Sequence, residues 1–330
     1  HTPELEETDV YLQSMDFAHA WMLGLIPTEE IYRELMGRVN SPTRIKDITS
    51  ALDERNHSLF HSLTQKVVNR ILEIELQRGD SETQVTRLAE ELHRVYGAET
   101  LIRILQAFGK DTFIRDSYNW RNTKRGVLSS LLHACYPSPD DDSDTLKSLA
   151  SQADISHIRL VEAAMFAPQW LELTEKATGW KGLESAAYYF HAHTSECFDD
   201  KKKAIIARYT PIAIEDLQEG AFDIDRFKEA YKAIGKERFE VVYNAAKYIS
   251  LSNTHTRARK FADAVNGKTK AADAKKEIIA KRNKDLLMSY GLIPLGRKAD
   301  KELLERYQFL QKFLKESKEF GAQRQESEKK

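Results

Sequence analysis

The sequence predicts an all-α protein built from antiparallel helix pairs. None of the eight prolines falls in residues 43–136 or 212–293, so two long stretches lack the residue that breaks helices. Apolar residues recur at helical spacing along most of the chain, whereas no stretch alternates convincingly with the period of a strand. Most of the fourteen glycines fall where a helical pattern stops, for example Gly97, Gly179 and Gly235. We therefore expect a HEAT-like α-solenoid or a compact helical array.

The helices of the first 135 residues are predicted from apolar stripes and capping residues. A wide apolar stripe runs along residues 59–76, at the spacing of one helix face. Ser81 and Gln84 match a capping box ahead of a helix that begins near Val85. Taken in order, helices are expected at 8–24, from Thr28 to about residue 36, from Ser41 onward, and at 59–76, 85–95, 98–108 and 121–135.

The segment YPSPDDDSD, residues 136–144, is the best candidate for a domain boundary. Two prolines and four aspartates in nine residues cannot continue a helix. We predict an acidic helical region at 1–139, an acidic linker at 140–152, and a helical core region at 153–330 that becomes basic toward its end. Beyond the boundary, helices are expected at 154–166, 168–177, 181–193, 199–209, 223–234, 236–250, 254–266, 270–290 and 299–327.

The composition excludes several protein classes. With 41% apolar and 31% charged residues, the chain is globular rather than disordered. Cys135 and Cys197 are too few for a disulfide scaffold or a four-thiolate zinc site, and they suit a reducing compartment. No apolar run approaches the roughly 20 residues that span a bilayer, and the first thirty residues hold seven acids and no Lys or Arg. We expect a cytoplasmic protein without membrane contact, and, because the chain begins at His1, a piece of a longer one.

The charge is distributed unevenly along the chain. A net charge of −1 conceals 20 basic and 32 acidic side chains in residues 1–200, against 30 and 19 in residues 201–330. A basic cluster in residues 241–300 can bind phosphates non-specifically, or it can meet an acidic protein surface. Contact with phosphate or nucleic acid is therefore an alternative function. Its candidate residues are Arg257, Arg259, Lys260, Lys281 and Arg282.

Two local matches to ligand-binding loops are incomplete. Residues 267–269 (GKT) resemble the end of a P-loop, but the earlier glycine is replaced by Ala262 and the segment follows a predicted helix. A helix C-cap explains them better. The aspartates of residues 140–144 have the first spacings of an EF-hand, yet Thr145 and Ser151 stand where glycine and glutamate are required. A solvated acidic linker is favoured over a weak cation site.

His191 and His193 lie in the aromatic segment YYFHAHTSEC. Residues two apart on a helix point to different sides, so one metal ion cannot easily bind both. His193 and Cys197 share a face only if the helix extends that far, and zinc would need further donors such as His157 or His255. We favour a buried helix whose histidines bond to backbone or carboxylate groups, with a metal or catalytic site as the alternative. No cofactor is expected.

The last predicted helix carries an apolar seam with spacings of four, three and four, which we expect to dock on the helical core. After Phe320 the stripe stops, so we expect the polar tail to lie in solvent or to meet another protein. The seam consists of Leu303, Tyr307, Leu310 and Leu314, with Phe313 and Phe320 beside them.

Four segments of the second half resemble a known family. They are RLVEAAMFAPQW (159–170), GWKGLESAAYYFHAHT (179–194), KRNKDLLMSYGLIPL (281–295) and RYQFLQKFLKESKEFGAQRQESEK (306–329). In this order they are similar to the core of large bacterial proteins of the molybdate metabolism regulator-like (MolR-like) family, some of which carry a WGR domain. The resemblance covers roughly residues 150–330. It implies a HEAT-like central region of a much longer cytoplasmic protein, and it supplies no reaction.

The resemblance marks residues for testing without assigning them a catalytic role. In KRNKD, charges at helix pitch are expected to form buried ion pairs between neighbouring helices, with Asn283 as a cross-link, and a structural role and a ligand site are equally consistent with the segment. The sequence therefore favours a non-catalytic scaffold whose partners are other domains of the same longer chain and separate proteins. The marked residues are Trp170, Trp180, His191, His193, Lys281, Arg282, Asn283, Lys284, Asp285, Lys315, Phe320, Arg324 and Glu326.

Overall fold

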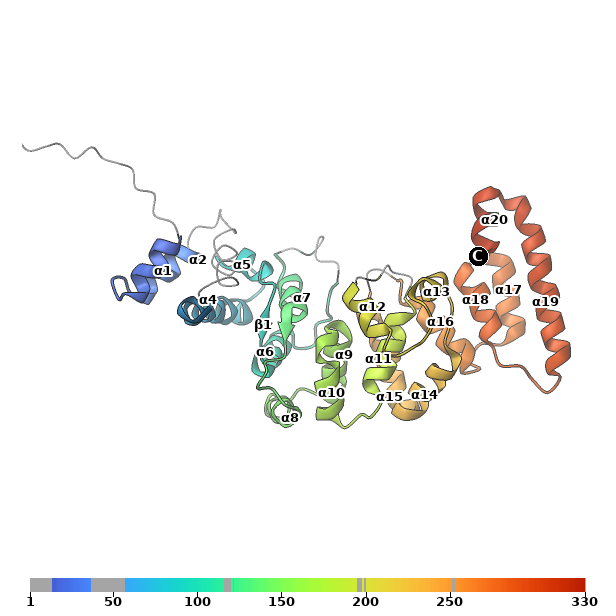
Figure 1. Ribbon diagram of the computed structural model, residues 1–330, viewed down its shortest axis with the longest axis horizontal. Helices are drawn as coiled ribbons and strands as arrows, with labels where there is room; N and C mark the ends of the chain where they lie inside the picture. Colours follow the sequence, from blue (N-terminus) through green and yellow to red (C-terminus); the bar gives the residue numbers. More distant parts are fainter. Residues whose placement is uncertain are drawn as a thin grey trace, which may run out of the picture. The chain divides into compact units, whose positions relative to one another are not determined.

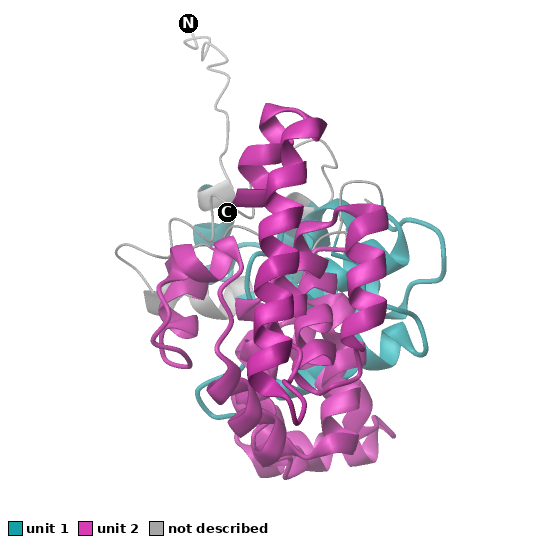
Figure 2. Ribbon diagram, turned by 90° about the vertical axis from the view of Figure 1, so that its right-hand side faces the viewer, with its two compact units in different colours: residues 1–141 teal, residues 142–330 magenta. Residues whose placement is uncertain are grey.

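The chain is all-α, as predicted (Figure 1). The computed structural model describes residues 14–36, 57–115, 120, 122–194, 198, 200–250 and 253–329, and the helix expected from Ser41 lies outside them. Within these residues, helices are joined by loops, apart from two strands of two residues each. The chain divides into two compact units, residues 1–141 and 142–330 (Figure 2).

Unit 1 is a small helical array with one short strand pair. Val95 pairs with Cys135 and Tyr96 with Tyr136 in parallel, a ladder too short to show an alternating sequence pattern. Its elements are α1 (Ser14–Met22), α2 (Thr28–Met36), α4 (His57–Gln77), α5 (Thr86–Glu90), β1 (Val95–Tyr96), α6 (Ala98–Phe108), α7 (Lys124–Ala134) and β2 (Cys135–Tyr136).

The predicted capping box of unit 1 is wrong. Helix α5 covers only Thr86–Glu90, and its N-cap residue, Val85, provides no side-chain cap. The turn before α5 is held from another element, because the Thr86 hydroxyl donates to Glu75 of α4 at 2.8 Å. After α5 the backbone leaves the helical conformation and enters β1, so the helix expected at 85–95 is cut short.

Unit 2 consists of helices throughout its described residues, with three short 3₁₀ turns (Figure 2). In chain order these are α8 (Ser143–Gln152), α9 (His157–Phe166), η1 (Pro168–Trp170), α10 (Leu171–Thr178), α11 (Leu183–Ala192), α12 (Asp200–Ile206), α13 (Ile214–Glu219), α14 (Ile224–Ile234), α15 (Lys236–Ala245), η2 (Ala246–Tyr248), α16 (Thr256–Val265), α17 (Ala271–Lys281), α18 (Lys284–Leu292), α19 (Ala299–Glu316), η3 (Ser317–Phe320) and α20 (Ala322–Lys329).

The acidic run between the units caps structure on both sides. Residues 143–152, which we expected to belong to a linker, form α8. The Asp142 carboxylate accepts a hydrogen bond from the Thr145 amide and caps this helix, a role for which aspartate is well suited. Asp141 accepts from the amides of Ala98 and Ser138 within unit 1. The carboxylates of Asp141 and Asp142 thus accept hydrogen bonds from backbone amides.

The helix predicted at 270–290 is broken into α17 and α18. Arg282 has a left-handed backbone with φ of 45°, and the next residue, Asn283, accepts from the Leu286 amide at 3.1 Å. An asparagine side chain competes for backbone groups and begins a new helix. The helix predicted at 299–327 is also interrupted, because η3 and Gly321, with φ of 93°, separate α19 from α20.

Unit 2 has an aromatic core around α11. Aromatic rings of α11, α14, α15 and α16 pack there edge-on or tilted, with Tyr189 and Phe227 ring centres 4.7 Å apart. A second cluster joins α16 to α17, α18 and α19, and includes Ile278, Tyr290 and Phe309. Among the described residues, no helix is both long and apolar enough to cross a bilayer.

Candidate functional site

The two histidines of α11 lie in the aromatic core. The rings of Tyr189 and Phe222 lie 4.7 and 4.8 Å from the His193 ring, whose Nδ1 is 2.8 Å from the Tyr189 carbonyl oxygen. Burial lowers the pKa of His193 to about 4, against a weaker opposing effect of that hydrogen bond. His191 is also buried, and its ring lies 5.7 Å from that of Tyr188. Both imidazoles therefore pack as core side chains.

Among the described residues, no metal-ligand set lies around these histidines. Helix α11 ends at Ala192, so it does not reach Cys197, which lies outside the described residues. His157 is exposed at the start of α9, and His255 is buried against Ser250. Within the described part of the chain, no group of three or more His, Cys, Asp or Glu side chains is arranged to hold a metal ion.

Trp170 and Trp180, which the sequence singled out, pack where one helix connects to the next. Trp170 is fully buried at the end of η1. Trp180 follows the left-handed Gly179 and lies 5.4 Å below the guanidinium of Arg238. Arg238 also donates to the Gly179 carbonyl at 3.4 Å. This contact fixes the entry into α11.

Two arginines of the basic cluster bind helix ends. Arg257 donates from Nη2 to the Leu217 carbonyl at 2.7 Å, and Arg259 donates from Nε to the Tyr243 carbonyl at 2.9 Å. These carbonyls belong to the last turns of α13 and α15, and the Leu217 carbonyl also accepts from the Gly220 amide at 3.1 Å. Lys260 lies 3.9 Å from the Asp285 carboxylate. Arg257 and Arg259 are therefore directed at the protein's own backbone.

The GKT segment ends a helix, as predicted. Gly267 has a left-handed backbone just after α16, with φ of 70°. The Lys268 ammonium donates to Glu240 at 2.5 Å and lies 3.7 Å from Asp263. The lysine is thus paired with carboxylates at a helix C-terminus, which is where the helix dipole favours a cation.

The KRNKD segment forms a turn, and its charges join neighbouring helices. Arg282 donates to Glu328 of α20 through Nε at 2.9 Å and Nη2 at 2.5 Å. Lys281 pairs with Glu277 at 2.5 Å within α17, and Lys284 with Glu219 at 3.4 Å. The buried ion pair predicted for this segment is present at Arg282, although the helix that was expected to carry it is broken there.

The seam predicted for α19 is confirmed only in part, because Leu310 and the neighbouring Phe313 pack in the second core cluster but the first half of the seam does not. The buried face of α19 consists of Arg306, Phe309 and Phe313. Leu303 and Tyr307, which we expected to dock on the core, are 57% and 60% exposed. Spacings of three and four hold for both faces, so the pattern alone does not decide which face is buried. The two phenylalanines dock because they meet the second core cluster.

A family comparison covers almost the whole chain. The model of a family of unknown function (DUF5724) matches residues 2–330. The chain belongs to this family. No curated protein and no solved structure matches it. Because the function of the DUF5724 family is unknown, membership does not indicate a reaction for this chain.

Unit 1 of this DUF5724 chain has an open surface pocket of about 520 Å³ that the sequence did not reveal. Acidic and basic side chains both line it, and the Arg125 guanidinium lies 5.4 Å from the Trp120 ring centre. Among the described residues that line it, none is a histidine or a cysteine. Its lining residues are Asp80, Glu82, Asp111, Trp120, Asn122, Thr123, Lys124 and Arg125.

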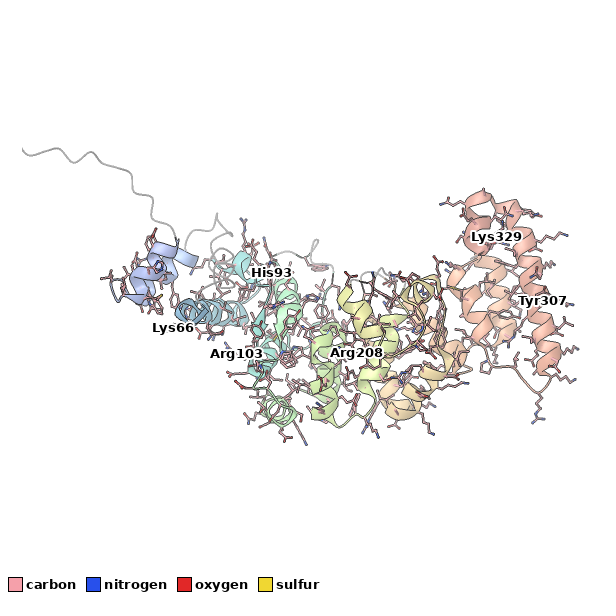
Figure 3. All side chains as sticks on the ribbon, viewed as in Figure 1. Lys66, His93, Arg103, Arg208, Tyr307 and Lys329 are labelled. Atoms are coloured by element: carbon pink, nitrogen blue, oxygen red, sulfur yellow. The ribbon has the colours of Figure 1, made fainter. Side chains whose placement is uncertain are left out.

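The C-terminal helices of this DUF5724 chain have two features that lie outside the core of unit 2. One is the outward apolar stripe of α19, formed by Leu303, Leu304 and Tyr307, with Tyr307 labelled in Figure 3. The other is the contact of Arg282 with α20. Lys315 and Glu326, which the sequence marked, are exposed. Arg324 lies 3.4 Å from Glu328.

Proposed function

We propose that this DUF5724 chain is a non-catalytic helical interaction module that binds a partner protein through α19. The observation that supports this is the stripe of Leu303, Leu304 and Tyr307, each more than half exposed on a helix of 18 residues. Single exposed apolar residues are ordinary, but three within five residues of one helix form a patch. Because each side chain is already partly covered, burial of its remaining surface in an interface contributes about 1–2 kcal/mol.

The chemistry of the stripe indicates an apolar partner helix. Its neighbours Lys301 and Glu305 pair within α19 at 3.8 Å, and Lys312 and Glu316 pair at 3.7 Å. Charges that are already paired contribute little to attraction over distance. Binding therefore depends on apolar burial, as when an amphipathic helix is recognised through residues spaced by three and four. We expect weak dependence on salt.

The wider context is part of the same proposal. The four segments that resemble the MolR-like core support a place in a long cytoplasmic bacterial protein of regulatory type, some relatives of which carry a WGR domain. The partner of α19 is then another domain of that chain or a separate protein. In this interpretation the helices form a HEAT-like scaffold, and α19 is its binding element.

Site-specific photo-crosslinking in the native host tests the proposal. A photoreactive phenylalanine analogue replaces Tyr307 in one strain and Lys312, whose side chain is 77% exposed on another face of α19, in a control strain. We expect one dominant adduct from position 307, identified by mass spectrometry as a peptide of the same chain or of one other protein. Purified partner should then bind the Leu303→Lys/Tyr307→Lys chain at least 10-fold more weakly. Equal adducts at both positions, or unchanged affinity, would refute the proposal.

A further inference from the structure

Helix α20 is attached to the rest of unit 2 through very few side chains. Its sequence, AQRQESEK, has no apolar stripe, and none of its residues is buried as a whole. The Glu328 carboxylate enters the protein, where its side chain is 5% exposed. Figure 1 shows α20 turning back from the end of α19. A polar helix of eight residues is unstable alone, so its position depends on this contact.

The Glu328 carboxylate lies in a site of defined geometry. The Arg282 guanidinium is placed between two aromatic rings, 3.9 Å from the Phe313 ring centre and 4.1 Å from that of Phe320. Its Nε and Nη2 both donate to Glu328, and Nη2 also donates to the Phe313 carbonyl at 3.2 Å. A planar guanidinium that stacks on rings and offers two parallel donors is suited to recognise a carboxylate.

The backbone at Arg282 is also specialised. Its φ of 45° is left-handed, a conformation that costs a residue other than glycine roughly 1–2 kcal/mol. The conformation aims the side chain between Phe313 and Phe320, away from the path of α17. Because the guanidinium is 8% exposed, it needs an anionic acceptor to offset its desolvation. The acceptor is supplied by a segment that contributes almost nothing else.

We propose that Arg282, Phe313 and Phe320 form a binding site for a carboxylate borne on a polar peptide segment, and that Glu328 occupies this site as an exchangeable intramolecular ligand. An acidic segment of a partner protein displaces α20 by taking over the two hydrogen bonds from Arg282. Gly321, with φ of 93°, precedes α20 and provides the point about which it moves. The α19 stripe and this site are separate, since none of Leu303, Leu304 and Tyr307 contributes to it.

Hydrogen exchange of the full chain tests the intramolecular half of the proposal. Glu328→Gln removes the charge, and Glu326→Gln makes the same change at an exposed position two residues away. We expect amide exchange in residues 323–329 to rise at least 10-fold in the first variant and to stay within twofold of the parent in the second. Equal exchange in the parent and both variants would overturn the proposal.

A peptide added in trans tests whether another carboxylate can replace Glu328 at Arg282. The probe is a fluorescently labelled peptide of residues 321–330, with a Glu328→Gln peptide as its control, and binding is followed by fluorescence anisotropy. We expect the acidic peptide to bind the Glu328→Gln chain at least 10-fold more tightly than the control peptide does. The Arg282→Lys/Glu328→Gln chain should lose this preference, because lysine keeps the charge without the paired donors. Equal binding of the two peptides, in chains with unchanged thermal unfolding, would overturn the proposal.

Discussion

The Arg257 guanidinium donates hydrogen bonds to the carbonyl oxygens of Leu217, at 2.7 Å, and Gln218, at 3.0 Å. Both acceptors belong to α13, a helix of six residues. A helix this short is not stable by itself, and the Gly220 amide, which donates to the Leu217 carbonyl at 3.1 Å, leaves the Gln218 carbonyl to Arg257. Arg257 thus provides from α16 the C-terminal cap that holds α13 in place.

Substitution of Arg257 by alanine should lower stability. Hydrogen bonds from a charged donor contribute about 1.5–3 kcal/mol, and their loss also removes the contact that ties the end of α13 to α16. We expect the free energy of unfolding of unit 2 to fall by about 2–3 kcal/mol, measured by urea unfolding. Lys260→Ala, on the same helix, should change it by at most about 0.5 kcal/mol. An unchanged midpoint for Arg257→Ala would contradict this role.

His193 should make unit 2 less stable in acid. Its pKa is lowered from 6.5 to about 4 by burial, with Arg257 lowering it further, and Asp223 and the Tyr189 carbonyl opposing. As the pH falls below 6.5, the unfolded state takes up a proton that the folded state does not. Stability is therefore fully present above pH 6.5 and is lost between about 6.5 and 4, by up to roughly 3 kcal/mol.

The measurement compares the free energy of unfolding at pH 7.5 and pH 4.5. In His193→Gln the side chain no longer titrates, so the loss over this interval should be smaller than in the parent chain. His157→Gln is the matched control, because His157 is exposed on α9. If the parent and His193→Gln lose equal stability, the imidazole is not kept neutral by its surroundings.

Gly182 should tolerate no side chain. It has φ of 88°, and a Cβ built on it would lie 2.8 Å from the Ala233 Cβ and 3.1 Å from the Ile234 amide nitrogen. Gly182→Ala combines backbone strain with a clash between the start of α11 and the end of α14. We expect a loss of about 2–4 kcal/mol.

Gly179 provides the comparison for this substitution. It has φ of 67°, but a Cβ there would meet nothing within 4 Å. Gly179→Ala should therefore cost only the backbone term, about 1–2 kcal/mol. Thermal unfolding of the two variants side by side separates strain from steric contact. Equal losses would mean that α11 and α14 separate readily.

The sequence predicted the long helices because each contains several turns of apolar periodicity. It did not reveal α13, whose six residues are too few to show a period. The sequence also predicted one continuous helix through Arg282. The break there consists of one left-handed residue and an asparagine N-cap, which leave the spacing of apolar residues nearly unchanged. Local patterns predict the middle of a helix. The residue at which a helix ends also depends on which side chains of other elements form hydrogen bonds with its terminal backbone groups.

The same limit applied to the candidate residues. Arg282 was marked in the sequence, but Glu328, its partner, was not, because 46 residues separate them and nothing local relates them. Arg257 and Arg259 were predicted to belong to a basic surface. The sequence shows their charge but not the backbone carbonyl groups to which their guanidinium groups donate. Positive charge near helix ends is as consistent with capping as with phosphate binding.

Unit 1 allows a sharp test of a buried ion pair. The Arg78 guanidinium lies 3.0 Å from the Glu75 carboxylate, and both side chains are almost wholly buried. Glu75 also accepts hydrogen bonds from the hydroxyls of Thr83 and Thr86. Glu75→Gln leaves the arginine charge buried without its counter-charge, and we expect a loss of about 3–5 kcal/mol.

Glu73→Gln is the matched control on the same helix. Glu73 lies 3.2 Å from Arg70, and both side chains are about half exposed, so this pair should contribute at most about 1 kcal/mol. Hydrogen exchange of α4 and α5 reports on unit 1 by itself. The double variant Glu75→Met/Arg78→Leu should regain the part of the loss that comes from the unpaired arginine charge, although it also removes the hydrogen bonds to Glu75 from Thr86 and to the Asn122 carbonyl from Arg78. A double variant no more stable than Glu75→Gln would show that α5 is held by the threonine hydrogen bonds to Glu75, with no separate contribution from its pairing with Arg78.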